Sequence, residues 1–415
     1  MVDIKKSKLY FPYTILIILY IFFIIAAFII DTPREIFSGL ANIILSPDIL
    51  ISDYVEIGGI GASLVNSALT SVLCMLLLIL SGVKPNGATI MSLWLITGFS
   101  FFGKNLLNIW PIIIGVYLYS KYEREPFLNY SLVALLSTAL APIVSQLSFI
   151  DSLPKITSIL LGYLIGIFTG FILTPIVSHC IKAHNGYNLY NIGFAAGLFA
   201  TLLMSIFRAI GIEFESRVLW NTESTHVFLV ILIIISLYLI FLGIYNNPRV
   251  KENYINLLKK PGRLVTDFYM LYGNTCYLNM GILCLLSTIL ILVLRADLNG
   301  GTIAGIFTIV GFSSFGKHLR NVIPVIIGAI LAALININPI NSPSLILSIL
   351  FSTSLAPIAG KYGFKIGILA GFLHVCMVNN IGYIHGGLNL YNNGLSAGLI
   401  AMLLIPVINV FKKET

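Results

Sequence analysis

The chain has 415 residues, of which 58% are hydrophobic and only 10% are charged, with a net charge of +8 at pH 7. Soluble domains carry about 25% charged residues, so this composition excludes an ordinary soluble protein and indicates an integral membrane protein. Apolar runs of about 20 residues recur, which predicts membrane-spanning α-helices rather than a β-barrel. The cations gather in loops and tails, where they orient helices and meet membrane lipid, so we expect no nucleic-acid partner.

Fourteen apolar segments are predicted as helices, seven in each half of the chain. The first seven lie at residues 11–30, 59–82, 87–102, 106–120, 128–147, 156–178 and 189–208. The second seven lie at residues 226–245, 271–295, 300–315, 320–335, 342–358, 364–380 and 391–411. The predicted fold class is therefore an all-α, multi-pass membrane protein.

The two halves repeat the same motifs in the same order. The stretch GFSFFGKNLLNIWPIIIG at residues 98–115 returns as GFSSFGKHLRNVIPVIIG at residues 311–328, an offset of 213 (311 − 98). Three further pairs follow: NGATI with NGGTI, STALAPI with STSLAPI, and HNGYNLYNIGFAAGL with HGGLNLYNNGLSAGL. We therefore predict two membrane repeats, residues 1–215 and 216–415.

The charged loops predict the orientation of the repeats. Lys5, Lys6 and Lys8 at the N-terminus, the basic loop 246–266, and the C-terminal lysines place both termini in the cytoplasm by the positive-inside rule. The loops 31–56 and 209–225 are rich in acidic residues and are placed outside. Because seven segments per repeat is an odd number, the second repeat must be inverted relative to the first. Many transporters share this architecture, and we expect a multi-pass protein of the inner (cytoplasmic) membrane.

The segments 87–102 and 106–120, with their counterparts in the second half, are the irregular part of the pattern. Each is near or below the length of about 17 residues that a helix needs to cross a bilayer. FGKN joins the first pair and FGKH the second. This predicts broken or re-entrant helices that meet near the midplane, where an irregular backbone must line a cavity or pack within protein. Such segments at matching places indicate a transport site.

Lys104 and Lys317 lie at the two predicted breaks. Facing a central cavity, each ammonium would attract an anion or donate to a polar solute. Alternatively, each lysine extends from a helix end to the membrane interface. The residues leave both interpretations open.

Other duplicated polar residues also carry two interpretations. In STxLAPI, the hydroxyls at a proline break bind solute, or they only bond the preceding helical turn. In NLYN, the polar side chains cap the next helix or gate an entrance. Asn66 and Asn279 lie within long helices, where an amide must bond across a helix interface or face a cavity.

The motifs that the sequence lacks disfavour two classes of function, ion-coupled pumps and enzymes. Neither half has an acidic residue inside a repeated motif, which disfavours a proton- or cation-coupled pump and favours a passive path. The sequence has no HExxH, Walker or CxxC motif, so we expect no enzyme, no metal and no cofactor.

On these motifs, the whole chain resembles an uncharacterised prokaryotic multi-pass membrane family that is catalogued only as a domain of unknown function. A weaker resemblance is to the urea-transporter family, in the stretches NLYNIGFAAGL and NLYNNGLSAGL and, loosely, in STALAPI and STSLAPI. That second resemblance implies inverted halves around a central pore and a homotrimer. The chain lacks the family's Leu-Pro pair before this Ser-Thr, and GFSxFGK has no counterpart there, so urea is not carried over as the substrate.

The sequence therefore predicts a channel or facilitative transporter for a small neutral or anionic solute, with its pathway between two inverted repeats. The alternative is a membrane-embedded enzyme or a lipid-binding subunit of a larger complex. We expect membrane lipid as a partner and a homo-oligomer, trimer or dimer. The candidate solute-binding residues are Lys104, Lys317, Ser100, Ser313, Phe102, Phe315, Ser137, Thr138, Ser352, Thr353, Asn66 and Asn279.

Overall fold

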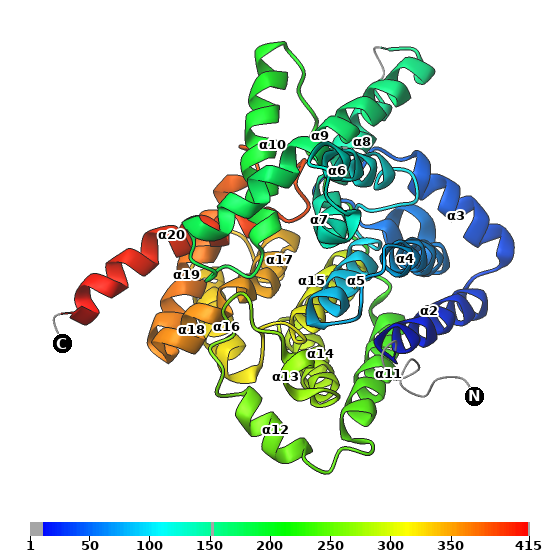
Figure 1. Cartoon of the computed structure of the whole chain (residues 1–415). Coiled ribbons are helices and arrows are strands. Elements are labelled where there is room, and N and C mark those ends of the chain that lie inside the picture. Colours follow the sequence, from blue (N-terminus) through cyan, green and yellow to red (C-terminus); the bar gives the residue numbers. More distant parts are fainter. Residues whose placement is uncertain (1–10, 151–152, 414–415) are drawn as a thin grey trace. The chain divides into compact units, whose positions relative to one another are not determined.

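The computed structural model describes residues 11–150 and 153–413, and its regular elements are helices (Figure 1). Within those ranges the chain has no β-strand, only an isolated bridge between Ser52 and Leu219. Lys5, Lys6 and Lys8, on which the predicted orientation partly depends, lie outside the described residues.

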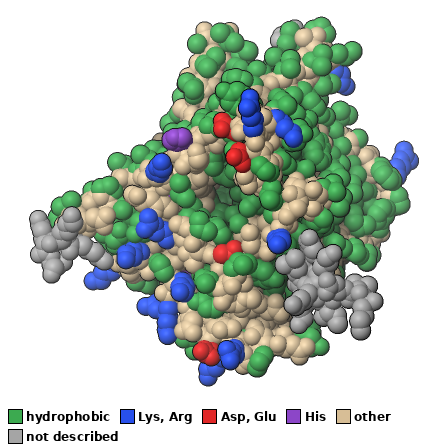
Figure 2. Space-filling view, in the orientation of Figure 1, with side chains coloured by type: hydrophobic (Ala, Val, Ile, Leu, Met, Phe, Trp, Pro, Cys, Tyr) green, Lys and Arg blue, Asp and Glu red, His purple; other side chains and the backbone are tan. Residues whose placement is uncertain are grey.

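Ten helices in the described ranges are long and apolar enough to cross a membrane. The all-helical, multi-pass character predicted from the sequence is therefore confirmed. The predicted count of fourteen apolar helical segments is not confirmed. Shorter apolar helices lie at Gly87–Phe99, Gly300–Phe312 and Leu319–Leu334, where broken or re-entrant segments are predicted. Hydrophobic side chains cover much of the visible surface (Figure 2), as expected where lipid replaces water.

The helices gather into two compact units, each built from three separate stretches of chain. The described residues of Met1–Thr174, Phe214–Leu229 and Asp297–Gly311 form the first unit. Those of Pro175–Glu213, Val230–Ala296 and Phe312–Thr415 form the second. The units thus exchange segments relative to the halves 1–215 and 216–415, and the division into two repeats stays a prediction.

The first unit begins with three helices, of which α2 (Phe11–Ile30) and α3 (Pro33–Leu45) both pack on α4 (Tyr54–Leu80), as the blue helices of Figure 1 show. Helix α3 starts at a capping box: the Glu35 carboxylate accepts from the Thr32 backbone N–H at 2.8 Å, and the Thr32 hydroxyl accepts from the Glu35 N–H. The unit continues with α5 (Gly87–Phe99), α6 (Trp110–Tyr122), η1 (Phe127–Asn129), α7 (Ser131–Ser137), η2 (Thr138–Leu140), α8 (Ala141–Ser148) and most of α9 (Lys155–Ala183).

In the second unit, α10 (Asn191–Ala209) packs on α20 (Asn392–Lys413), and α16 (Leu319–Leu334) packs on α19 (Phe364–Ile381). Its other helices are most of α11 (Thr225–Ile244), α12 (Val250–Leu257), α13 (Phe268–Tyr272), α14 (Thr275–Val293), α17 (Pro343–Ser352), η3 (Thr353–Leu355) and α18 (Ala356–Tyr362). Helix α15 (Gly300–Phe312) leads into this unit from the first.

The predicted breaks are present in both halves. Helices α5 and α15 have 13 residues each, a length of about 20 Å, which is too short to cross a bilayer core of about 30 Å. Each is followed by a turn in which a glycine, Gly103 or Gly316, has a positive φ of 94° or 117°. Most other residues cannot take this conformation without strain, so the glycines of FGKN and FGKH allow the turn that follows each helix.

Candidate functional site

Lys104 and Lys317 follow these turns, and both side chains are completely buried within the chain. A lysine that extends to the membrane interface would keep its ammonium exposed. The burial of both side chains therefore does not support the interfacial interpretation.

The second unit surrounds the Lys317 ammonium with hydroxyl groups and aromatic rings. Its Nζ donates to the Tyr190 hydroxyl at 2.6 Å and to the Thr353 hydroxyl at 2.8 Å. It also lies 4.6 Å from the centre of the Tyr190 ring and 5.1 Å from that of Phe312. In the described part of the chain, no carboxylate forms an ion pair with Lys317. A lysine that carries its full charge has three N–H donors, and two are used here, so the protonated side chain can donate once more.

The first unit places Lys104 in a related setting. Its Nζ lies 5.4 Å from the centre of the Phe99 ring, and this ring lies 6.3 Å from that of Phe102. Phe102 and its counterpart Phe315 are both buried. Aromatic faces stabilise a desolvated cation, so the first phenylalanine of each GFSxFGK motif, Phe99 or Phe312, gives its lysine a suitable neighbour.

Asn66 and Asn279 hold the turns that carry the two lysines. Asn66 Nδ2 donates to the carbonyl groups of Ser100 and Lys104, at 2.7 and 2.9 Å. Asn279 Nδ2 makes the same two bonds to Ser313 and Lys317, both at 2.8 Å. These amides bond across a helix interface, as one interpretation of the sequence required. Among the described residues their Oδ1 atoms accept no hydrogen bond, so only that oxygen is left for a solute.

The hydroxyls of STxLAPI bond mainly to the preceding helical turn, as one of the two interpretations required. The η2 and η3 turns separate α7 from α8 and α17 from α18, so each motif is a helix break. Thr138, Ser352 and Thr353 donate to carbonyl groups three residues back, at 2.5, 2.7 and 2.7 Å. Thr353 also accepts from Lys317, whereas the Ser137 hydroxyl has no hydrogen-bond partner in the described residues. The Ser100 hydroxyl likewise donates within its own helix, to the Ile96 carbonyl at 2.8 Å.

Tyr190 joins the site, although the sequence offered its NLYN motif only as a cap or a gate. Helix α10 has no side-chain cap, and the Asn188 side chain instead accepts from the Tyr190 N–H at 2.9 Å. This turn directs the Tyr190 ring toward Phe312, at 4.9 Å between ring centres, and its hydroxyl toward Lys317. The duplicated tyrosine within a polar motif was the signal that could have identified it.

A buried carboxylate also touches a repeated motif, which sequence reasoning missed. Asp48 lies in the loop between α3 and α4, outside the spans, and it is completely buried. Its Oδ2 accepts from Asn108 at 2.9 Å, Asn105 at 3.1 Å and the Ser145 hydroxyl at 2.8 Å. Burial raises the pKa of this carboxyl to about 7, against the opposing effect of these donors. The absence of acids from the motifs themselves therefore does not mean that no acid contacts them.

Comparison of the sequence with models of known protein families identifies the family of this chain. Residues 32–209 and 246–410 match the model of a family described as proteins of unknown function, DUF1576. The chain belongs to this family. The match spans both copies of each motif, so the buried lysines and asparagines lie within the family's region, and the predicted resemblance is confirmed. No curated protein and no solved structure matches the chain, and the urea-transporter resemblance rests on the motifs alone.

Proposed function

We propose that the chain is a channel or facilitative transporter for a small neutral or anionic solute in the cytoplasmic membrane. The observation that carries this proposal is the Lys317 side chain, which is buried among two hydroxyls and two aromatic rings and has no carboxylate partner among residues 11–150 and 153–413. A buried charge is costly, and intramembrane ionisable residues mark solute pathways. An ammonium with one unused N–H suits an anion or a carbonyl oxygen.

The proposal includes two inverted repeats, with the broken helices near the midplane. Reciprocal hydrogen bonds within the second unit support it. Asn188 Nδ2 donates to the Gly394 carbonyl at 3.0 Å, and Asn389 Nδ2 donates to the Gly193 carbonyl at 3.3 Å. Both pairs of counterparts are 201 positions apart (389 − 188 and 394 − 193). A two-fold axis produces such a mutual exchange of one contact.

A second reciprocal contact, within the first unit, supports the inverted repeats independently and joins α5 to α15. A side-chain carbon on Gly98 would meet Phe307, and one on Gly311 would meet Trp94. These positions correspond at the offset of 213 (307 − 94 and 311 − 98). The basic loop 246–266 supports cytoplasmic termini through the positive-inside rule.

A flux assay in proteoliposomes tests the proposed function. Vesicles with and without the protein are loaded with small neutral solutes and small anions, and efflux is followed for each. We expect faster efflux of at least one solute with the protein, and about a tenfold loss of anion flux for Lys317→Met. Lys365→Met removes the same charge from an exposed site on α19 and serves as the matched control.

Two results would overturn the proposal. One is that no solute leaves protein-containing vesicles faster than empty ones. The other is that Lys317→Met and Lys365→Met have equal flux while both variants keep the thermal stability of the parent, since the buried ammonium would then play no part in solute selection.

A further inference from the structure

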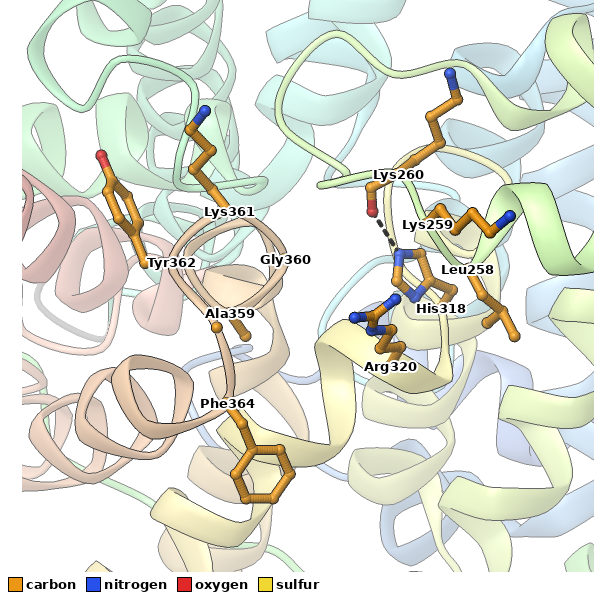
Figure 3. Close-up of a pocket in the computed structure, with 11 residues that line it drawn as sticks. Leu258, Lys259, Lys260, His318, Arg320, Ala359, Gly360, Lys361, Tyr362 and Phe364 are labelled. Atoms are coloured by element: carbon orange, nitrogen blue, oxygen red, sulfur yellow. Dashed lines mark hydrogen bonds between the residues drawn. The ribbon is translucent and has the colours of Figure 1, made fainter.

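A pocket of about 390 Å³ opens in the second unit, and neither Lys317 nor its partners Tyr190 and Thr353 line it. Residues 258–260, His318, Arg320 and residues 359–364 line it. Figure 3 shows Lys259, Lys260 and Arg320 on one side of the pocket and Lys361 on the other. The 11 lining residues include four permanent cations and no acid, so the pocket has an excess of positive charge.

The backbone that presents these cations is anchored. His318 Nε2 donates to the Lys260 carbonyl at 2.7 Å, and Asn321 Nδ2 donates to the Gly316 carbonyl at 2.9 Å. Burial, and secondarily Arg320, lower the pKa of His318 to about 4. The imidazole is therefore neutral at pH 7 and keeps its proton on Nε2, because a carbonyl can only accept. The wall of the pocket is fixed before any ligand arrives, which lowers the entropy cost of binding.

Two glycines allow this loop to lie close to its neighbours. Gly262, at a φ of +75°, lies against the Gly316 carbonyl, and a side-chain carbon there would also meet the Asn321 amide. Gly360 leaves space for the Pro261 carbonyl. The loop is thereby held between the turn after α15 and helix α18, which brings Lys260 and Lys361 to the same pocket.

The four cations that line the pocket have no charged counterparts in the first half of the chain. The bond from the Phe268 N–H to the Ser314 carbonyl, at 3.0 Å, matches the bond from the Tyr54 N–H to the Phe101 carbonyl, at 3.1 Å. Matching these two bonds pairs each residue of the loop before Phe268 with the residue 214 positions earlier (268 − 54). It pairs each residue of the turn after α15 with the residue 213 positions earlier (314 − 101). The STxLAPI motif sets an offset of 215 for the helix that follows it (352 − 137). At these three offsets the first-half counterparts of the four cations are Leu45, Ser46, Leu107 and Gln146, and all are uncharged. The repeated fold is built without these charges, so they serve something specific to the second half.

We propose that this pocket binds a phosphate group, carried either by an anionic lipid headgroup or by a small soluble phosphorylated molecule. Four cations suit the negatively charged oxygens of a phosphate group, whether it is a singly charged lipid phosphodiester or a more highly charged soluble phosphate. The planar Arg320 guanidinium can pair with two phosphate oxygens at once, and lysines complement it as point charges. Phe364, which is 55% exposed at the rim, offers an apolar contact beside the charges. The site is separate from Lys317, and its occupancy does not depend on the proposed transport.

The test uses the full chain in nanodiscs and compares two double variants. Arg320→Gln with Lys361→Gln removes one cation from each side of the pocket. Lys251→Gln with Lys365→Gln removes the same charge from exposed sites of the same unit that do not line it. Inorganic pyrophosphate is titrated into protein in phosphatidylcholine nanodiscs by calorimetry. In a second arm, phosphatidylglycerol that stays bound after transfer into neutral detergent is counted by native mass spectrometry.

We expect the pocket variant to weaken pyrophosphate binding, or to lose retained phosphatidylglycerol, by about tenfold relative to the parent and the control variant. Pyrophosphate binding without lipid retention assigns a soluble ligand, and lipid retention alone assigns a headgroup. The proposal is overturned if the parent binds neither probe, or if both double variants lose binding equally, since general surface charge would then explain it. If the double variant does not fold, Lys361→Gln alone, on the exposed end of α18, decides between these outcomes.

Discussion

Replacing Asn279 with leucine tests how the turn after α15 is held. The Asn279 amide donates to the carbonyl groups of Ser313 and Lys317, both at 2.8 Å. Leucine has nearly the same size but no donor, so the change removes two hydrogen bonds without opening a cavity. Both bonds cross from α14 to the turn that carries Lys317. The loss in the free energy of unfolding therefore measures how strongly these two bonds, here called the clamp, hold the turn.

The expected loss has a lower and an upper bound. Hydrogen bonds between helices in membrane proteins average about 0.6 kcal/mol, which gives a lower bound of about 1 kcal/mol for two bonds. A buried polar group left without a partner costs about 1–3 kcal/mol, which gives an upper bound of about 6 kcal/mol. Because the turn carbonyls lie outside a regular helix, we expect a value well above the lower bound.

The free energy of unfolding is measured in mixed micelles by titration with sodium dodecyl sulfate, followed by tryptophan fluorescence. Thr288→Val is the matched control on α14, since the Thr288 hydroxyl donates only to the Cys284 carbonyl one turn back, at 2.9 Å. We expect Asn66→Leu to behave like Asn279→Leu, because Asn66 makes the equivalent bonds. Equal stability of Asn279→Leu and Thr288→Val would refute the clamp.

Two further predictions concern stability. Because the pKa of Asp48 rises from an ordinary 3.8 to about 7, the native state keeps a proton that the unfolded state releases. Stability should therefore fall by up to about 4 kcal/mol as the pH rises from 4 to 7, and Asp48→Asn should flatten this profile. Burial also raises the pKa of Asp53 to about 7, so the variant will keep part of the pH dependence of stability. A slope of stability against pH that is unchanged in Asp48→Asn would contradict the raised pKa of Asp48. Gly328→Ala should cost about 1–3 kcal/mol by unfolding titration, because its new methyl group meets the Ile368 carbonyl where α16 crosses α19. Gly382→Ala, which meets no atom within 4 Å, should be neutral, and equal losses would show that the helix crossing is not the cause.

The breaks after α5 and α15 could be predicted from the sequence because their causes are local. Glycine at positions 103 and 316 ends each helix through its own backbone freedom, and the apolar runs beside it are too short to span. The repeat strengthened this prediction, since the same residues recur at matching places. The short helices α3, α12 and α13 were not predicted, because their composition does not separate them from loops.

The partners of the polar side chains could not be predicted, because they come from distant parts of the chain. Tyr190 is 127 residues from Lys317, and Ser145 is 97 residues from Asp48. Nothing in a local pattern shows that such residues meet. The charge of loop 31–56 predicts only that it lies outside the membrane, and nothing in the sequence shows that packing buries Asp48 completely against Asn108 and Ser145.

The sequence by itself determined that this protein is a multi-pass membrane protein with duplicated motifs and broken helices. Composition, segment length and helix-breaking residues act locally or over one segment, so they can be read in order along the chain. Only the tertiary structure decided that Lys317 is buried against Tyr190 and Thr353, and that Lys260 and Lys361 share a pocket. Those contacts depend on how helices pack, and packing brings together residues that the order of the chain keeps apart.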